Sequence, residues 1–386
     1  MFFSAPQYDP AVANDINALR TMLKRLHAGK VGRRKVAKQE NTGPATNDEE
    51  PEEYHVEEGV SFFVRFGLGR FMALRLFPDV QDAWLGDQNF RESAEQGREI
   101  FPGAKLSFTE HVKSNPAYAD AMLQFTAESM DIINLVMFEV ARELEYRKSS
   151  IKLKSAFTGV GRGPRNILGF YDGKSNTPPS ERGQFIELDG PNGLERSTFL
   201  AFIRMRLNMQ VWPSRMEERE RWIGRTLQDG NLIQPDGSPF AIGTDENKID
   251  SKSVFADSHV SVVRDGNLKI FRQGYEFQEF DYHDRTAAPV VGLNFISFQN
   301  KPDTICSLLK NMNSSFSPLA DAGPAPFATA DAAGIFFVPS REALQKLFNS
   351  IPSTYKKGTY GTSYDYEPRA IDIARALRGQ EPAHSG

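Results

Sequence analysis

The sequence contains a single cysteine, Cys306, in 386 residues, so no disulfide can form within the chain. A reducing compartment suits such a chain, and we expect a cytoplasmic protein. No apolar run is long enough to span a bilayer, which predicts no membrane association. The N-terminal stretch MFFSAPQYDP also lacks the charged start and apolar core of a signal peptide.

Neither sign of charge is in marked excess, because 46 Lys and Arg face 50 Asp and Glu, for a net charge of -4. This balance gives no electrostatic case for nucleic-acid binding. The six histidines show no paired metal-ligand spacing, and no G-x-S-x-G or phosphate-binding loop occurs. Gly159 and Gly161 begin a dinucleotide-like pattern, but Pro164 stands where its third glycine is needed. Zinc hydrolases, serine hydrolases and Rossmann dehydrogenases are therefore disfavoured.

Residues 1–54 have the composition of an N-terminal extension and linker. The stretch AVANDINALRTMLKRLHAG predicts one amphipathic helix, but the polar stretch after it swings from basic to acidic with hardly any apolar residue. The apolar face of that helix comprises Ile16, Leu19, Met22, Leu23 and Leu26.

Strands and helices interleave along the rest of the chain, which fits α/β or α+β architecture. Residues 203–211 alternate strictly between apolar and polar, which predicts a strand with one solvent-exposed face. Ser214 and Glu217 have the spacing of a capping box before a helix that runs to about Arg225. Further strands are expected near 60–66, 120–128, 291–300 and 333–339, and helices near 130–146, 303–312 and 340–351.

Three polar residues stand in unusual settings, although each has an ordinary explanation. Asp172 lies in NILGFYDGKSN, where Asp-Gly is also a common turn dipeptide. His259 lies among apolar residues and is compatible with a core histidine. Arg272 follows Ile270 and Phe271, where a charge is costly unless it is paired or reaches solvent.

Taken together, these segments resemble the dye-decolorising peroxidases, a family of haem enzymes. NILGFYDGKSN resembles the family's G-x-x-D-G signature, DSHVSVV its histidine segment and IFRQGYEF its arginine segment. GVSFFVRFGLG, ERERWIGRTLQDG and GLNFISFQ match further family segments, and the ordered set covers roughly residues 58–350. The resemblance implies an α+β fold of two ferredoxin-like domains, 55–165 and 166–386, with antiparallel sheets covered by helices and haem in the C-terminal domain.

The resemblance also assigns roles to individual residues. His259 would be the iron ligand of haem b, and Asp172 and Arg272 would stand on the opposite, distal side. The remaining predicted contacts are Leu293 and Phe295 in the distal pocket, Arg225 at a haem propionate, and the backbone of Gly173 and Lys174 at the macrocycle edge. Hydrogen peroxide and a dye, phenol or other bulky organic reductant would be the substrates.

The predicted base suits acidic conditions, because aspartate has an ordinary pKa of about 3.9 and histidine one of about 6.5. Three departures from the family pattern are visible. Gln273 follows Arg272 where a second arginine is common, and Thr177 is inserted after Asn176. The acid that usually holds the iron-binding histidine is not evident, which leaves Asp331 or Asp321 as candidates.

Two other functions stay open from the sequence. The same fold serves a protein that handles haem or releases its iron, with incidental peroxidase activity. A non-catalytic ferredoxin-like assembly protein is the second. The sequence names neither the physiological reductant nor the oligomeric state, so a homo-oligomer is left open.

Overall fold

The structure is a computed structural model of the chain. It describes residues 1–5, 11–27, 30–34, 52–55, 62–84, 119–161, 163–189, 194–256, 258–264, 268–280, 289–314 and 327–350. The strands are β1 (Phe2–Ser4), β2 (Lys30–Arg34), β3 (Glu52–His55), β4 (Phe62–Leu68), β5 (Ala121–Ala127), β6 (Lys152–Ser155), β7 (Thr198–Leu207), β8 (Phe271–Glu279), β9 (Val290–Gln299) and β10 (Ala328–Val338). The helices are α1 (Ala11–His27), α2 (Arg70–Leu76), α3 (Gln81–Trp84), α5 (Met130–Tyr146), α6 (Pro179–Phe185), α7 (Met216–Ile223), α8 (His259–Arg264), α9 (Pro302–Ser314) and α10 (Arg341–Ser350), with the 3-10 turns η1 (Pro78–Val80), η4 (Glu246–Lys248) and η5 (Ser251–Ser253).

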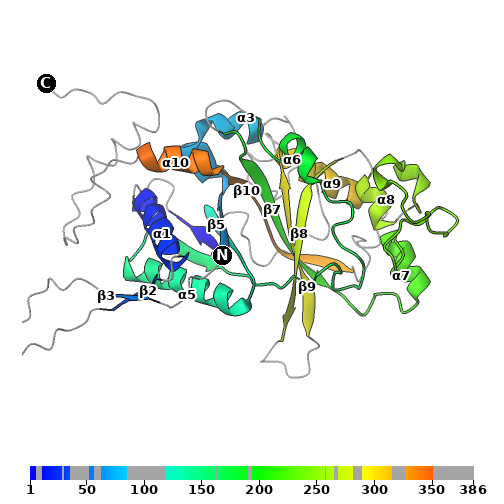
Figure 1. Ribbon diagram of the computed structural model, residues 1–386, viewed down its shortest axis with the longest axis horizontal. Coiled ribbons are helices and arrows are strands. Elements are labelled where there is room, and N and C mark those ends of the chain that lie inside the picture. The colour runs from blue at the N-terminus through cyan, green and yellow to red at the C-terminus, as the bar shows by residue number, and fades with distance from the viewer. Residues whose placement is uncertain are drawn as a thin grey trace, which may run out of the picture.

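Eight strands form one antiparallel sheet in the order β6-β1-β5-β4-β10-β7-β9-β8, and β2 pairs with β3 separately. The N-terminal half of the sheet comes from β1, β4, β5 and β6, and the C-terminal half from β7 to β10. The halves meet where Leu68 of β4 pairs with Phe337 of β10. The fold is α+β with two ferredoxin-like halves, which lie side by side in Figure 1.

The sheet is folded over at the junction of β4 and β10. The rings of Phe2 in β1 and Phe202 in β7 are 5.0 Å apart, although four strand spacings separate these strands. In a flat sheet that separation would be roughly 19 Å, because neighbouring strands lie about 4.8 Å apart. The inner faces of the two halves therefore pack together, and Met122, Leu200, Phe298 and Phe336 fill the space between them.

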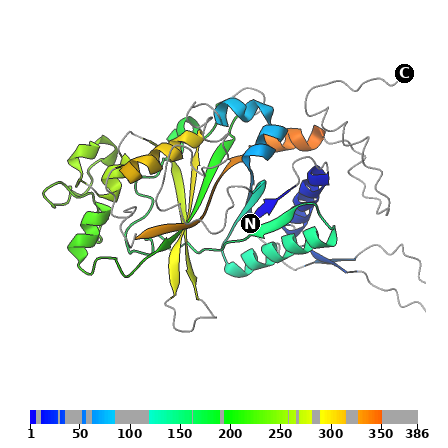
Figure 2. The same ribbon diagram turned by 180° about the vertical axis from the view of Figure 1, so that it is seen from behind.

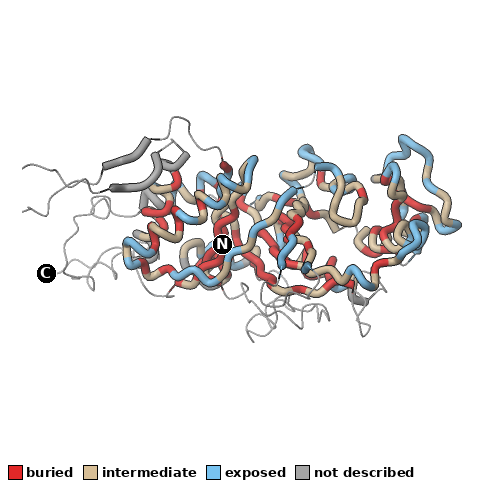
Figure 3. Tube along the Cα trace, turned by 90° about the horizontal axis from the view of Figure 1, so that it is seen from below, coloured by how far each residue is buried: buried red, intermediate tan, exposed pale blue. Residues whose placement is uncertain are grey.

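Helices cover the outer faces of both halves. Ser129 caps α5 by accepting a hydrogen bond from the Ile132 amide at 3.3 Å, and the predicted helix over 130–146 is confirmed. Figure 2 shows α5 in cyan-green along the N-terminal half and α9 in amber on the C-terminal half. The buried segments in Figure 3 run through both halves. Within the described segments, no helix combines the length and apolar character that a membrane span requires.

Part of the predicted N-terminal extension is built into the fold instead. β1 lies between β6 and β5, and α1 packs on α5 with Ile16, Leu19 and Leu23 buried. A three-residue strand has no periodicity that a sequence can reveal, which explains the difference. The predicted linker lies largely outside the described residues, and the boundary at residue 165 stays a prediction.

Two local predictions are wrong. Arg204 of β7 was expected on an exposed face but is 2% exposed, because that face packs inside the folded sheet. Its guanidinium lies 3.4 Å from the centre of the Phe277 ring and pairs with Glu279. The helix α7 begins after Arg215 with no side-chain cap, so Ser214 and Glu217 form no capping box.

Candidate active site

A cavity of about 670 Å³ lies in the C-terminal half. Its volume is in the range of pockets that hold a cofactor or a drug-sized ligand. One wall is the outer face of the sheet, where Ile203 pairs with Phe295 and Met205 with Leu293. Opposite elements are α8, α9 and the loop from Asn166 to Pro178. The predicted pocket residues Leu293 and Phe295 therefore do line a pocket, because strand alternation turns both toward it.

The loop that carries Asp172 is held by its own polar groups. The Asn166 side chain accepts hydrogen bonds from the amides of Leu168 at 3.1 Å and Phe170 at 3.2 Å. The Asp172 amide donates to the Pro164 carbonyl at 2.9 Å. Gly173 follows with a φ of +79°, and its amide donates to Asp172 Oδ1 at 2.7 Å. This turn needs glycine, and it fixes the carboxylate at the cavity.

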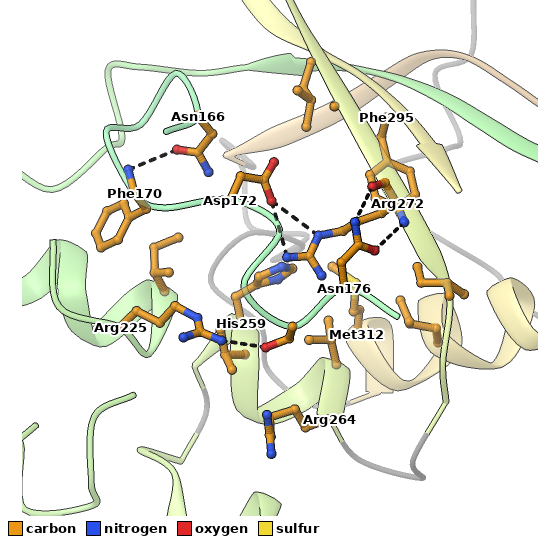
Figure 4. Close-up of a pocket in the computed structure, with 18 of the residues that line it drawn as sticks. Asn166, Phe170, Asp172, Asn176, Arg225, His259, Arg264, Arg272, Phe295 and Met312 are labelled. Atoms are coloured by element: carbon orange, nitrogen blue, oxygen red, sulfur yellow. Dashed lines mark hydrogen bonds and ion pairs between the residues drawn. The ribbon is translucent and has the colours of Figure 1, made fainter. Parts of the chain in front are cut away.

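Arg272 meets Asp172 at the cavity wall. Its Nε and Nη2 lie 3.4 and 3.3 Å from Asp172 Oδ1, and both side chains are about one-third exposed, at 31% and 36%. The Asn176 side chain clasps the backbone of Arg272, since it donates to the carbonyl and accepts from the amide, each at 2.8 Å (Figure 4). Thr177 adds a further hydrogen bond between this loop and the start of β8, because its hydroxyl donates to the Ile270 carbonyl at 2.8 Å.

Gly274, two residues after Arg272, leaves space between β8 and the Asp172 carboxylate because it has no side chain. A Cβ at this position would lie 3.0 Å from Leu293 Cδ1 and 3.5 Å from Asp172 Oδ2. A Cβ would thus press on the Leu293 side chain and reach van der Waals contact with Asp172, so a larger side chain would take up the space beside the predicted base. A glycine within a strand pattern is a known sign of such a close approach.

His259 is the first residue of α8 and lines the same cavity. Burial lowers the pKa of His259 to about 4, with the charge of Arg272 acting in the same direction and Asp172 opposing it. The imidazole is therefore neutral over most of the working pH range. Its Nδ1 is buried and has no hydrogen-bond partner among the described residues. Asp331, a candidate partner, instead accepts from Arg206 at 3.1 Å, and Asp321 lies outside the described residues.

Arg225 also lines the cavity, but its guanidinium is already engaged. Nη1 donates to the Gly230 carbonyl at 2.7 Å and to Glu246 Oε1 at 2.8 Å. Nη2 donates to Ser175 at 2.6 Å and to Glu246 Oε2 at 2.7 Å. Desolvation alone would raise the pKa of Glu246, but its contacts with Arg225, Ser175 and Lys174 bring that pKa below its ordinary value.

Two of the predicted contact residues stand back from the cavity. Gly173 and Lys174 are not among its lining residues. The Lys174 ammonium group donates to the Asp229 carbonyl and lies 5.3 Å from the centre of the Tyr171 ring. The predicted contact of this backbone with a macrocycle therefore has no support from the cavity lining. Over the described residues, no cluster of three His, Cys, Asp or Glu side chains is suited to bind a metal ion.

Residues 163–343 match the family model described as Dyp-type peroxidase, C-terminal. The C-terminal half of the chain is thus similar to the C-terminal domain of Dyp-type peroxidases. Every residue with a predicted role lies within the match, from Asp172 to Phe295. A comparison with curated proteins gives no significant match.

Solved structures extend this likeness to both halves of the fold. A DyP-type peroxidase from Cellulomonas bogoriensis aligns with a TM-score of 0.59 and 16% identity, over 88% of each chain. Ferric DtpA from Streptomyces lividans aligns with a TM-score of 0.58 and 19% identity, over 90% of this chain and 91% of that one. A dye-decolorizing peroxidase from Bacteroides thetaiotaomicron gives 0.56 and 18%, over 90% and 94%. At such identities the likeness concerns the fold.

Sequence reasoning missed several residues of this site. Asn176 was seen only as part of a motif, and Gly274 only as the residue after a departure from the family pattern. Glu246 and Arg264 were not singled out at all. The glycine within a strand was a usable signal, whereas the partners of Glu246 and Arg264 depend on contacts between distant segments.

Proposed function

We propose that this chain is a haem-dependent peroxidase that reduces hydrogen peroxide and oxidises bulky organic donors such as dyes or phenols. One observation carries the proposal. A single cavity is lined by a neutral histidine, His259, and by the Asp172–Arg272 pair. These are a metal ligand, a base and a permanent cation, which together are the groups that peroxide chemistry requires.

The cavity fits a haem by the chemistry of its lining. His259 has the lone pair of a neutral imidazole, which is the form that binds iron. The surrounding wall is apolar, with Ile203, Met205, Leu293 and Phe295 on the sheet and Leu309 on α9. A bound haem b would supply the iron at which peroxide reacts, and His259 would hold it.

Asp172 would act as the base. Its carboxylate lies at the cavity on a turn that three hydrogen bonds hold in place: the Asn166 side chain accepts two from backbone amides, and the Asp172 amide donates the third to the Pro164 carbonyl. It would take the proton from one peroxide oxygen and return it to the other, a transfer that general acid–base catalysis accelerates about 100-fold or more. The carboxylate is within reach because Gly274 leaves space beside it.

Arg272 would stabilise the negative charge that develops as the O–O bond breaks. Its guanidinium is permanently charged and has planar donor groups. Its 3.3 and 3.4 Å contacts with Asp172 are longer than a strong ion pair, which leaves the fork able to turn toward a substrate oxygen. Organic donors larger than peroxide would deliver electrons from the protein surface, because a haem would fill the apolar part of the cavity.

An absorbance titration of the purified chain with haemin tests the proposal. We expect stoichiometric uptake with a Soret band, followed by peroxide-dependent dye oxidation. His259→Leu, which replaces the imidazole by an apolar side chain, should lose the native Soret band and the dye oxidation while its circular dichroism spectrum stays unchanged. A wild-type chain that takes up no haemin, or a His259→Leu variant with the native spectrum, would exclude this function as stated.

A further inference from the structure

Four cationic side chains line the cavity: Arg225, Arg264, Lys269 and Arg272. Three of them have a carboxylate partner. Arg225 pairs with Glu246 at 2.7 Å, Arg272 with Asp172 at 3.3 Å, and Lys269 with Glu181 at hydrogen-bond distance. Arg264 differs, because no carboxylate among the described residues forms an ion pair with it.

Arg264 is the last residue of α8, the helix that begins with His259. Only Nη2 of its guanidinium is engaged, and both acceptors are backbone carbonyls, those of Glu246 and of Ile249, the latter at 3.0 Å. Nε and Nη1 have no hydrogen bond to any residue in the described part of the chain. Burial lowers the pKa of Arg264, Arg225 adds to this effect, and Glu246 opposes it. The side chain therefore has an incompletely compensated charge at the cavity.

Arg225 is poorly placed to bind an anionic group of a ligand. Its two terminal nitrogens make four hydrogen bonds, two of them to the carboxylate of Glu246. The side chain is 6% exposed, so releasing Glu246 would leave charges in a desolvated place. In this arrangement Arg225 joins three segments of the chain beside the cavity, around Ser175, Gly230 and Glu246, and is not free to receive an incoming anion.

We propose that Arg264 binds the anionic group of the cavity's ligand, and that Arg225 is a structural residue of the wall. The inference rests on the proposed function, in which the ligand is a haem and its anionic group is a propionate carboxylate. His259 and Arg264, the first and last residues of α8, would then hold the iron and a propionate of the same ligand. Asp172 and Arg272 remain free for peroxide.

Haemin and haemin dimethyl ester distinguish this proposal, because the ester has the same iron and ring but no carboxylate. Dissociation constants for both ligands are measured by absorbance titration with the wild type, Arg264→Gln and Arg264→Lys. Lys252→Gln is the matched control, since it removes an exposed cation from η5 that does not line the cavity. Circular dichroism and thermal unfolding show whether each variant is folded.

The wild type should bind haemin roughly ten to a hundred times more tightly than the ester, the range of a charge-assisted hydrogen bond. Arg264→Gln should lose most of that preference, whereas Arg264→Lys should keep a part of it and Lys252→Gln all of it. An Arg264→Gln variant with the full preference overturns the proposal, as does a wild type that binds both ligands equally. If Arg264→Gln does not fold, the affinities of the wild type for haemin and for the ester still test whether the cavity binds a carboxylate. Failure of the wild type to bind haemin at all would instead remove the proposed function, and this inference with it.

Discussion

Acid should destabilise the ligand-free chain through His259. The folded-state pKa of His259 is about 4, against an ordinary value of 6.5, because burial disfavours the imidazolium. As the pH falls below 6.5, the unfolded chain takes up this proton first, and the free energy of unfolding decreases. The stabilisation is complete above about pH 6.5 and is lost progressively toward pH 4. Below that pH the folded chain is protonated too, and the difference stays constant.

The size of the effect follows from the shift. The difference of about 2.5 between the two pKa values corresponds to about 3.5 kcal/mol, at roughly 1.4 kcal/mol for each tenfold change in the proton equilibrium. The ring is partly accessible through the cavity, and water there would screen the charge. Because of this screening we expect a contribution of about 1–3 kcal/mol.

Urea unfolding of the ligand-free wild type and His259→Leu at pH 7.5, 6, 5 and 4 measures this contribution. Leucine has a similar size and no proton to gain, and all other titrating groups are common to both proteins. The difference in unfolding free energy between the two should be constant above about pH 6.5 and should move by about 1–3 kcal/mol in favour of the variant by pH 4. Parallel curves across the range would refute a neutral, desolvated His259.

Four further outcomes are expected of the haem-loaded protein. Asp172→Asn should slow the first absorbance change after mixing with peroxide about 100-fold or more and leave the haemin dissociation constant unchanged, and an unaltered rate would remove Asp172 as the base. Arg272→Leu should slow the same step about 100-fold, also with normal haemin uptake, which stopped-flow absorbance and titration together report. Asn176→Ala should lower the unfolding free energy by about 1–3 kcal/mol and slow the peroxide step. Asn176→Asp should be intermediate, because it keeps the acceptor for the Arg272 amide. If both variants behaved like the wild type, the two hydrogen bonds between Asn176 and Arg272 would not matter. Gly274→Val should reduce the peroxide rate while circular dichroism stays native, and a normal rate would show that the space beside Asp172 is not needed.

The sequence by itself determined most of the secondary structure and the order in which the site segments follow one another along the chain. The alternation over residues 203–211 predicted a strand, which the structure has as β7. The family resemblance pointed to Leu293 and Phe295 as pocket residues, and both line the cavity. The spacing over 130–146 predicted α5 because helical periodicity is a local property of the chain. The sequence also predicted the turn at Asp172, since Asp-Gly followed by polar residues favours a turn over a helix or a strand.

Only the tertiary structure decided which polar groups meet. Arg204 was expected in solvent, but the sheet folds over it. The pairing of Arg225 with Glu246, 21 residues later, was not foreseen, and the expected place of Arg225 at a propionate stays a prediction. Asn176 and Arg272 are 96 residues apart, and their clasp joins a loop to a strand. A hydrogen bond depends on positions within a few tenths of an ångström, and for such distant residues those positions come from the packing of the whole sheet, which no local pattern contains.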